Sequence, residues 1–511
     1  MRNAAAMPLA CLMACLMLAG CALPSLETRV ASTALPVHAD TRIGRAIAPL
    51  AQDKDGLTGV HALVDGRDAF AARMMMADAA ERSLDIQYYI WRNDTTGLLL
   101  LDALRAAAGR GVRVRLLLDD NNSASLDPAL ALLDAHPNAE VRLFNPFAFR
   151  TARLLGFLTD FKRLNRRMHN KSFTADGQAT IVGGRNVGNE YYDATGEVLF
   201  ADLDVLAVGA VVGAVQRDFD RYWNSRSAYP AGLLLTRSQQ GDAARLDARR
   251  ARLAGNPGAQ AYLRAMRSST FVTQLTERTL PLEWVKVELV SDDPDKVLGA
   301  SPEAGVAYQL PPKFGEPLRQ VDLVSPYFVP GANWTARFGL LARNGIRVRI
   351  LTNSLEATDV PAVHAGYARW RRSLLADGVR LLELKRSWPQ PTEARRTLGG
   401  SSGSSLHAKT FAVDQSRMFV GSFNFDPRSA DLNTEMGFII DSPALSARMS
   451  EVLDKQIMAR AYEVTLTPQG RLQWHEQGER GMMVHDIEPG TTLWQRATVQ
   501  FMSLLPIEWM L

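Results

Sequence analysis

The chain has 511 residues, of which 47% are hydrophobic and 22% are charged, a composition that excludes wholesale disorder. This length corresponds to two or three domain equivalents with sizeable cores. The net charge of +4 is only mildly basic, so it is compatible with an anionic membrane surface or with nucleic acid and decides between neither.

Residues 1–21 have the features of a targeting segment. An uncharged apolar run, Ala4–Met17, follows a positively charged start and is too short to span a membrane comfortably. The segment ends in Leu-Ala-Gly-Cys, which resembles a bacterial lipobox and predicts that Cys21 is acylated. A plain signal peptide or a retained inner-membrane anchor is the alternative. Because the only other cysteines are Cys11 and Cys15, the mature chain would contain no disulfide and no cysteine-based metal site or nucleophile.

Residues 22–60 combine prolines with small polar residues, and we expect them to form a tether. A first α/β module is expected at 61–235, where strands at Ser83–Ile90 and Val112–Leu118 flank an amphipathic helix at Gly97–Gly109. The polar run Asp119–Asn122 follows the second strand, where α/β sheets place their binding loops. These residues could coordinate a metal, but we favour their formation of turns and helix caps.

A short polar motif lies further along this module. His169 is followed by Lys171 and Asp176, and then by Gly-Gly-Arg-Asn, which ends at Asn186. The basic residues just before the motif, 162–167, predict either a surface for anionic headgroups or a solvated loop. Asp202 and Asp204 follow in a strand-like segment.

The motif recurs in the second half of the chain. His407, Lys409 and Asp414 have the same spacing and are followed by Gly-Ser-Phe-Asn, which contains Ser422 and Asn424, and then by Glu435. His407 stands 238 residues after His169, and strand patterns recur at similar offsets. Residues 301–460 therefore predict a second, similar module. Two modules related by a pseudo-two-fold axis would form one site at their interface.

The segments around the second module carry weaker signals. Residues 236–300 are interpreted as a connector without chemistry. His364 and Tyr367 lie on a predicted helix and would either position a substrate or be structural. The Gly/Ser run 399–405 predicts a mobile loop that could act as a lid. The tail 461–511 ends in an amphipathic segment that would pack on the domain or lie on a membrane, and we favour packing.

The residue types of the motif indicate phosphodiester chemistry. If Leu406–Val413 is a strand, His407 and Lys409 point to one face. An ammonium and an imidazole side by side suit a tetrahedral anion. Cleavage needs a nucleophile, a proton for the leaving oxygen and cations on the other oxygens, and two histidines can divide the first two roles. Strand parity turns Asp176 and Asp414 off this face, so we expect these two members of the catalytic motif to brace it.

The doubled H-x-K-x4-D with Gly-(Gly/Ser)-x-Asn resembles the phospholipase D superfamily. Longer strings, such as Leu84–Trp91 and His364–Trp370, are similar to those of bacterial cardiolipin synthases, and the resemblance covers nearly everything after about residue 60. It implies an α/β fold of two α-β-α sandwich modules with one shared active site. It also implies a phosphatidyltransferase in which His169 forms a phosphatidyl-histidine and His407 acts as acid and base. The imperfect symmetry of the halves leaves the reverse assignment open.

The resemblance also assigns the remaining polar residues. Four side chains would bind the phosphate oxygens in place of a metal: Lys171, Lys409, Asn186 and Asn424, with Ser422 in the same substrate-binding set. Glu435, together with Asp202 or Asp204, would orient the histidines. No metal and no cofactor is expected.

Membrane phospholipids are the partners that the resemblance implies. A phosphatidyl group would move from phosphatidylethanolamine, or from a second phosphatidylglycerol, onto phosphatidylglycerol to make cardiolipin. The alternative is a phospholipase D-type phosphodiesterase that uses water and acts on phospholipid or nucleic acid. A catalytically inactive, membrane-tethered binding protein is a third hypothesis, but pure binding would not need two intact histidine motifs. We expect no nucleic acid partner, and an accessory protein is left open.

Cys21 is followed by Ala22 rather than Asp, which favours the periplasmic face of the outer membrane.

Overall fold

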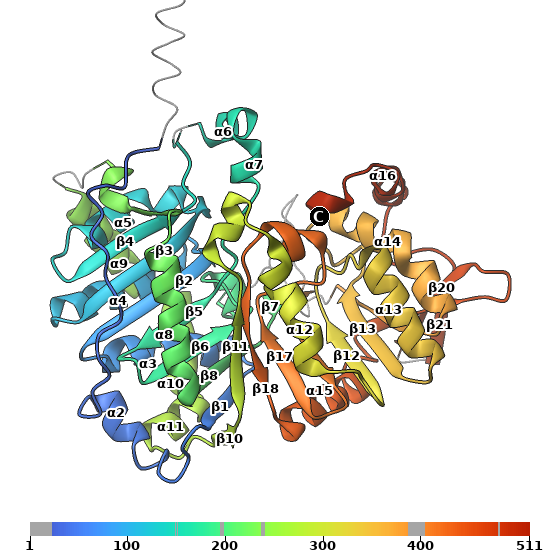
Figure 1. The fold of residues 1–511 in the computed structure, drawn as a ribbon, viewed down its shortest axis with the longest axis horizontal. Coiled ribbons are helices and arrows are strands. Elements are labelled where there is room, and N and C mark those ends of the chain that lie inside the picture. The colour runs from blue at the N-terminus through green and yellow to red at the C-terminus, as the bar shows by residue number, and fades with distance from the viewer. Residues whose placement is uncertain are drawn as a thin grey trace, which may run out of the picture.

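The computed structural model describes residues 23–148, 150, 152–194, 199–236, 241–386, 404–478 and 481–511. Figure 1 shows two α/β modules side by side, each built on its own large sheet. Cys21 and the Gly/Ser run up to residue 403 lie outside the described residues.

The first module is organised around a nine-stranded sheet. Strands β2, β3 and β4 run parallel, and every other neighbouring pair is antiparallel. In spatial order the strands are β10 (Glu283–Val285), β1 (Thr58–Leu63), β8 (Asp204–Gly209), β6 (Ala179–Gly183), β5 (Ser172–Ala175), β2 (Ser83–Ile90), β3 (Arg113–Asn122), β4 (Ala139–Phe144) and β9 (Ala228–Pro230).

The strands expected from alternation are present, with one difference in length. The expected strand at Ser83–Ile90 is confirmed as β2. In contrast, β3 continues through Asn122, so the expectation of a loop at Asp119–Asn122 is wrong. The side chain of Asp119 accepts hydrogen bonds from the backbone amides of Met168 and Asn121, which keeps this polar end of the strand in place.

Helices cover both faces of the first sheet. Helix α3 forms because its apolar residues Phe70 and Met76 face the core, and Asp65 caps its first amides. The described helices up to residue 276 are α2 (Arg42–Ile47), α3 (Gly66–Ala79), α4 (Thr95–Gly109), α5 (Asp127–Asp134), α6 (Arg153–Thr159), α7 (Phe161–Leu164), α8 (Ala210–Trp223), α9 (Asp242–Gly255), α10 (Pro257–Arg267) and α11 (Thr270–Thr276).

The second module repeats this plan on a ten-stranded sheet. Its parallel centre is β12, β13 and β14. In spatial order the strands are β11 (Val287–Ser291), β18 (Met436–Ile440), β17 (Arg417–Gly421), β16 (Thr410–Val413), β12 (Gln320–Val324), β13 (Arg347–Asn353), β14 (Arg380–Leu384), β19 (Ala461–Leu466), β20 (Leu472–Gly478) and β21 (Gly481–His485). Its helices are α12 (Val306–Phe314), α13 (Gly331–Arg343), α14 (Pro361–Ala376), α15 (Pro443–Lys455) and α16 (Leu493–Ser503).

The two sheets have matching connections. In each module the strand after the H-x-K motif, β5 or β16, pairs antiparallel with the first parallel strand and with the following strand, β6 or β17. This correspondence confirms the predicted fold of two similar modules.

Three features join the modules. Strands β10 and β11 follow each other closely in sequence, yet the first belongs to one sheet and the second to the other. A short parallel pair, β7 (Leu199–Ala201) with β15 (Ser404–Leu406), also spans the boundary. Finally, buried residues of both modules form one apolar cluster, in which Val211 and Val215 of α8 pack with Phe438 of β18. This shared core positions the loops that carry the two motifs.

The segment expected to be a tether lies against the first module where it is described. The guanidinium of Arg29 donates to the carbonyl oxygens of Asn224 and Ala228 at 2.7 and 2.9 Å. The backbone amide of Ala34 donates to Asp220. These contacts hold the chain along the module before α2 begins.

Candidate active site

The first motif histidine is held at the module boundary by the backbone. The amide of His169 donates to the carbonyl of Thr434 at 2.8 Å, and the amide of Thr434 donates to the carbonyl of Arg167 at 2.9 Å. A short stretch of the first module is thereby paired with the stretch that precedes β18 in the second module. As a result, His169 lies beside Glu435, which comes directly after Thr434 in the chain.

The imidazole of His169 contacts the carboxylate of the opposite module. Its Nδ1 lies 2.8 Å from Oε2 and 3.0 Å from Oε1 of Glu435. His169 is 7% exposed, and Glu435 is fully buried. Since Nδ1 is occupied by the carboxylate, Nε2 is the ring nitrogen that can meet a substrate.

The second histidine has the reciprocal arrangement. Strand β15 pairs with β7, and the amide of His407 donates to the carbonyl of Ala201 at 2.9 Å. Nδ1 of His407 then lies 2.5 Å from Oδ2 of Asp202. Each histidine is therefore paired with a carboxylate from the other module, an exchange that the sequence did not reveal. Asp204 instead pairs with Arg73 inside the first module, at 2.8 Å.

The backbone around the motifs differs from the expected strand. Strand β15 ends at Leu406 and β16 begins at Thr410, so His407 and Lys409 lie in the irregular segment between two different sheets. The expectation of one continuous strand over Leu406–Val413 is wrong. The physical reason is that the chain leaves the pairing with β7 before it joins the main sheet at β16.

The Gly/Ser difference between the halves follows from the length of the carboxylate side chain. The amides of Gly184 and Ser422 make equivalent hydrogen bonds, to the carbonyls of Leu203 and Met436. A Cβ atom at Gly184 would lie 2.1 Å from Oδ1 of Asp202, so the site has room only for glycine. In the other half, the hydroxyl of Ser422 donates to Oε2 of the longer Glu435 at 2.5 Å. The structure thus places Ser422 against the carboxylate that contacts His169.

The two lysines join the site from both modules. Nζ of Lys171 donates to the carbonyl of His169 at 2.5 Å, and Nζ of Lys409 lies 2.9 Å from Nδ1 of His407 and also contacts its carbonyl. Burial, partly offset by the carboxylates, lowers the pKa of Lys171 to about 7 and that of Lys409 to about 8. Lys409 acts electrostatically on His169, and Lys171 acts on His407, so the two motifs converge on one site.

The two histidine–carboxylate pairs differ in their charge. Burial and the nearby lysines hold the pKa of His169 well below its usual value, and burial together with Lys409 lowers that of His407 to about 4. Burial raises the pKa of Glu435 to about 7. Burial would also raise that of Asp202, but His407 and Lys409 hold the pKa of Asp202 below its ordinary value. Asp202 therefore stays ionised, while Glu435 titrates near neutrality.

Four further side chains line this region. The amide nitrogen of Asn186 donates to the hydroxyl of Tyr191 at 3.1 Å. The side-chain oxygen of Asn424 is buried without a hydrogen-bond partner among the described residues. Tyr89 packs edge-on against His169, with ring centroids 5.0 Å apart, and Tyr191 packs in the same way against His407 at 5.1 Å. Sequence reasoning missed both tyrosines, although Tyr89 lies one residue from the carboxyl end of a predicted strand.

The motif aspartates lie away from the histidines. Asp176 accepts hydrogen bonds from the amides of residues 81–83, and Asp414 accepts from the amides of residues 318–320, at distances between 2.7 and 3.2 Å. Both residues have positive φ, 52° and 53°. Each carboxylate ties the turn after β5 or β16 to the start of the neighbouring strand, which holds the motif strand in register.

Comparison with known proteins places this site in a family. The family described as cardiolipin synthase, phospholipase D-like domain, matches residues 74–223 and 314–457. The chain belongs to this family. Cardiolipin synthase C of Escherichia coli K12 is 48% identical over 92% of this chain and 100% of its own length, and cardiolipin synthase B of the same strain is 23% identical over 81% and 84%. The crystal structure of phosphatidylserine synthase from Haemophilus influenzae shares the fold, with a TM-score of 0.54, 13% identity, and coverage of 92% of this chain and all of that one.

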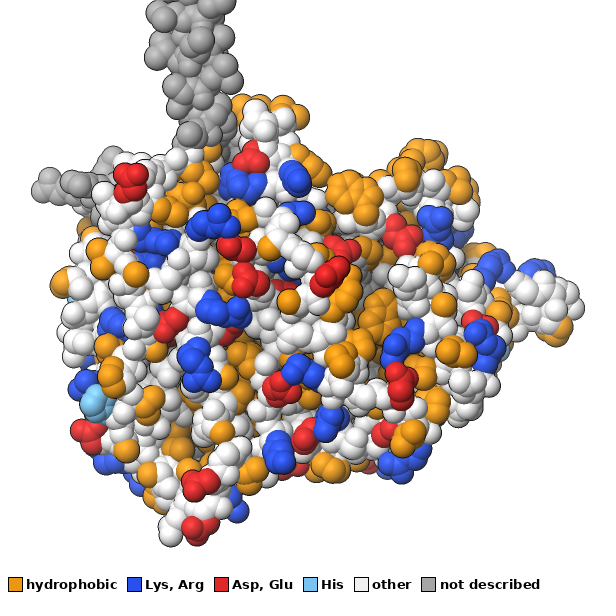
Figure 2. All heavy atoms as spheres, viewed as in Figure 1, with side chains coloured by type: hydrophobic (Ala, Val, Ile, Leu, Met, Phe, Trp, Pro, Cys, Tyr) orange, Lys and Arg blue, Asp and Glu red, His pale blue; other side chains and the backbone are white. Residues whose placement is uncertain are grey.

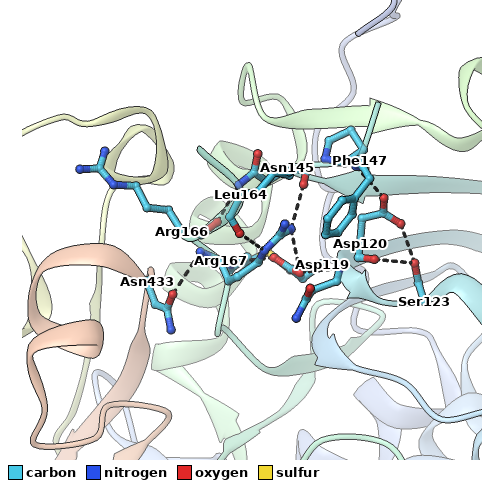
Figure 3. A network of polar contacts seen from close by, with 12 residues as sticks. Asp119, Asp120, Ser123, Asn145, Phe147, Leu164, Arg166, Arg167 and Asn433 are labelled. Carbon is cyan, nitrogen blue, oxygen red and sulfur yellow. Dashed lines mark hydrogen bonds and ion pairs between the residues drawn. The ribbon is translucent and has the colours of Figure 1, made fainter. Parts of the chain in front are cut away.

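Behind His169, the phospholipase D-like site is supported by a polar network that Figure 3 shows. Arg167 points between Asp119 and Asn145, donating to Asn145 O at 2.9 Å and lying 3.3 Å from Asp119 Oδ1. On the other side, the backbone amide of Arg167 donates to Asn433 of the second module at 3.1 Å. Asp120 accepts from the amide of Phe147. Asp119 holds the backbone amide of Met168, directly before His169, and Asp120 holds the segment that follows β4. The solvated-loop interpretation is wrong for Arg167, which is 2% exposed.

Two other sequence candidates lie apart from this network. His364 is buried on α14, with Nε2 3.1 Å from Glu488, and the hydroxyl of Tyr367 donates to Glu383 at 3.1 Å. His364 ties the C-terminal segment to α14, and Tyr367 ties α14 to β14 within the second module, which agrees with the structural alternative. In the part of the chain that the structure describes, no group of three or more His, Cys, Asp or Glu could hold a metal ion. The described residues also include no helix long and apolar enough to cross a membrane.

Proposed function

We propose that this protein is a phosphatidyltransferase that makes cardiolipin. It transfers a phosphatidyl group from phosphatidylethanolamine, or from a second phosphatidylglycerol, to phosphatidylglycerol. The observation that carries phosphoryl transfer is the convergence of two histidines and two lysines, each histidine held by a carboxylate of the other module. The 48% identity to cardiolipin synthase C over that protein's whole length supports a lipid alcohol as the acceptor.

The first step is attack on the donor lipid. Nε2 of neutral His169 attacks phosphorus, the bond from phosphorus to the headgroup oxygen breaks, and that oxygen takes a proton from His407. The lowered pKa of His169 keeps this side chain neutral and nucleophilic. Burial and Lys409 also lower the pKa of His407, to about 4, but ionised Asp202 beside it opposes this lowering and favours the protonated form. An anionic phosphodiester entering the site favours protonation of His407 further.

The second step transfers the group to the acceptor. His407, now neutral, takes the proton from a glycerol hydroxyl of phosphatidylglycerol, the freed oxygen attacks phosphorus, and the bond to His169 breaks. Lys171 and Lys409 hold the negative phosphate oxygens in both steps. Asn186 and Asn424 complete the phosphate site through their side-chain amides. Ser422 acts through Glu435, and Asp176 and Asp414 act by bracing the motifs.

Lipid mass spectrometry tests this function. Purified protein is incubated with phosphatidylglycerol, with and without phosphatidylethanolamine. Cardiolipin that forms only in the mixture, with release of ethanolamine, supports transfer from phosphatidylethanolamine, whereas cardiolipin from phosphatidylglycerol alone, with release of glycerol, makes that lipid the donor. Phosphatidic acid alone would identify water as the acceptor and overturn the synthase assignment. A folded His169→Ala variant, the matched control, should make neither product.

We also propose that the protein is a lipoprotein attached to the membrane through Cys21 and facing the periplasm, with the outer membrane as its location. The lipobox-like sequence before Cys21 supports this, and substrates that are confined to a bilayer give it a physical reason. Mass spectrometry of the mature N-terminal peptide and membrane fractionation test it. An unmodified Cys21 would refute the anchor, and an inner-membrane fraction would refute the location.

A further inference from the structure

Helix α16 exposes the face that a soluble helix would bury. Its large apolar side chains Leu493, Trp494, Phe501 and the following Leu504 are 71%, 81%, 63% and 75% exposed. At 3.6 residues per turn these four positions fall within about 100° of one another, so they form one stripe along the helix. An apolar stripe of this kind normally packs on a core.

The opposite face of α16 makes the contact with the protein. Val499 is 5% exposed and packs with Leu355 and with Ala365 of α14. Arg496 donates to the carbonyl of Thr491. The helix is thus fixed in an orientation that leaves the apolar stripe outward. Packing on the domain, which we favoured from the sequence, is confirmed, but it uses the narrower face.

A second group of exposed apolar side chains lies on the first module. Leu155 and Leu158 of α6 and Phe161 of α7 are 55%, 82% and 45% exposed. Figure 1 shows α6, α7 and α16 at the same end of the molecule, and Figure 2 shows hydrophobic side chains gathered over α6 and α16. Lys162, the next residue of α7 after Phe161, is also exposed.

Hydrogen bonds through one arginine connect the two groups. Arg428 donates to the carbonyl and side-chain oxygens of Asn165, which follows α7, at 2.9 and 2.7 Å. The guanidinium of Arg428 also donates to the carbonyl of Met510, and the backbone amide of Arg428 donates to the carbonyl of Leu511. Both acceptors follow α16 in the chain. The two apolar groups therefore belong to one side of the protein, although they come from different modules.

This side is also the side of the candidate active site. His169 follows α7 after four residues and packs on Tyr89 near the carboxyl end of β2. In the second module, Asn353 at the carboxyl end of β13 donates to the carbonyl of Leu406, the residue before His407, at 3.1 Å. A flat apolar surface that contacts the exposed side chains of α6, α7 and α16 would therefore face the edge of the sheets where the motifs converge.

We propose that α6, α7 and α16 form a docking surface for a phospholipid bilayer, with Trp494 and Phe501 inserted at the boundary between headgroups and acyl chains. Tryptophan is enriched at this boundary, and helices with one apolar face lie in its plane. The choice of a bilayer as occupant rests on the proposed function, because lipid substrates must reach the site from a membrane. Two apolar groups on either side of the active-site edge fit a planar surface, whereas a second copy bound there would cover that edge.

Depth-dependent quenching tests the docking surface directly. A single environment-sensitive fluorophore is placed in the full-length protein, with Cys11, Cys15 and Cys21 replaced by serine, by Trp494→Cys, by Phe501→Cys or by the control Leu340→Cys. Leu340 is 52% exposed near the C-terminal end of α13, just before β13 begins, and so lies at the opposite end of the sheet from the two histidines. With vesicles of phosphatidylglycerol and phosphatidylethanolamine, the first two labels should shift to the blue and be quenched by lipids brominated on their chains, and the control should not. Equal behaviour of all three labels would overturn the proposal.

A comparison of two substrate forms separates docking from chemistry. Trp494→Asp combined with Phe501→Asp should reduce turnover of vesicle lipids by about 10-fold or more, because charged side chains replace the inserted apolar area. Turnover of a short-chain, monomeric phosphatidylglycerol should stay at the parent rate, and Leu340→Asp should change neither. Equal loss on both substrate forms, or a dimer in sedimentation that the double substitution dissociates, would overturn the bilayer as occupant. If no variant transfers lipid at all, the proposed function fails, while the quenching result still decides the docking surface.

Discussion

The crosswise pairing of histidines and carboxylates leads to a prediction about Asp202. Oδ2 of Asp202 lies 2.5 Å from Nδ1 of His407, and the negative charge favours the protonated imidazole. Asp202→Asn keeps the shape of the side chain but removes the charge. The pKa of His407 should fall further, so His407 becomes a poorer proton donor for the leaving alcohol.

The structure sets the size of this effect. A hydrogen bond to a charged group contributes ~1.5–3 kcal/mol. If that contribution is lost only in the transition state, the rate of transfer between natural lipids should fall by about 10- to 150-fold, since ~1.36 kcal/mol corresponds to tenfold. Complete removal of the proton carrier, as in His407→Ala, should cost ~10²- to 10⁴-fold.

An activated donor distinguishes the roles of the two histidines. The phosphatidyl ester of p-nitrophenol has a leaving oxygen that needs no proton. Asp202→Asn should therefore release p-nitrophenol in a burst close to the parent rate, and then accumulate phosphatidyl-His169 because His407 no longer activates the acceptor. Glu435→Gln should show no burst, because the amide can donate to Nδ1 of His169 and leave the proton on Nε2, where it blocks attack.

Stopped-flow absorbance measures the burst, and mass spectrometry of peptides locates the intermediate. Circular dichroism and thermal melting of both variants provide the folding control. A burst with Glu435→Gln but none with Asp202→Asn would refute the assignment and exchange the roles of His169 and His407. Loss of the burst in both folded variants would refute the idea that each carboxylate serves one step.

Three further results are expected. First, kcat/KM should decline as pH rises above about 7, because Lys171, whose pKa is about 7, loses the positive charge that binds phosphate. Lys171→Arg stays charged and should extend the active pH range if the side chain fits. An unchanged pH profile with no loss of activity in this variant would contradict a role for Lys171. Second, Asp176→Ala should lower the free energy of unfolding by ~2–4 kcal/mol in denaturant titrations, because three backbone amides lose their acceptor. The folded fraction should keep its turnover. A large loss of turnover at full stability would indicate a chemical role for Asp176 instead. Third, transfer activity should persist in excess chelator, and recovery of a chelated enzyme only by added divalent cation would contradict phosphate binding by lysines alone.

Several features of the protein follow from its sequence alone. The doubled motif at His169 and His407, with recurring strand patterns, is enough to predict two similar α/β modules, because a local repeat produces a local structure wherever it occurs. The strand Ser83–Ile90 can also be predicted, since Leu84, Ile86 and Tyr88 recur with a period of two, although residues 83–88 are all buried in the structure. The bracing that we expected of Asp176 and Asp414 agrees with their hydrogen bonds to backbone amides, although the continuous strand behind the parity argument is interrupted in the structure.

The partners of these residues were decided only by the tertiary structure. Glu435 and His169 are 266 residues apart, and Asp202 and His407 are 205 apart, so their pairing depends on how the two modules pack. Asp202 and Asp204 have the same parity, and only the fold shows that Arg73 pairs with the second of them. Likewise, amphipathicity identifies the apolar stripe of α16 but not the side on which it lies. Periodicity in the sequence shows which face of a helix or strand is apolar, whereas contacts between distant segments determine what that face packs against.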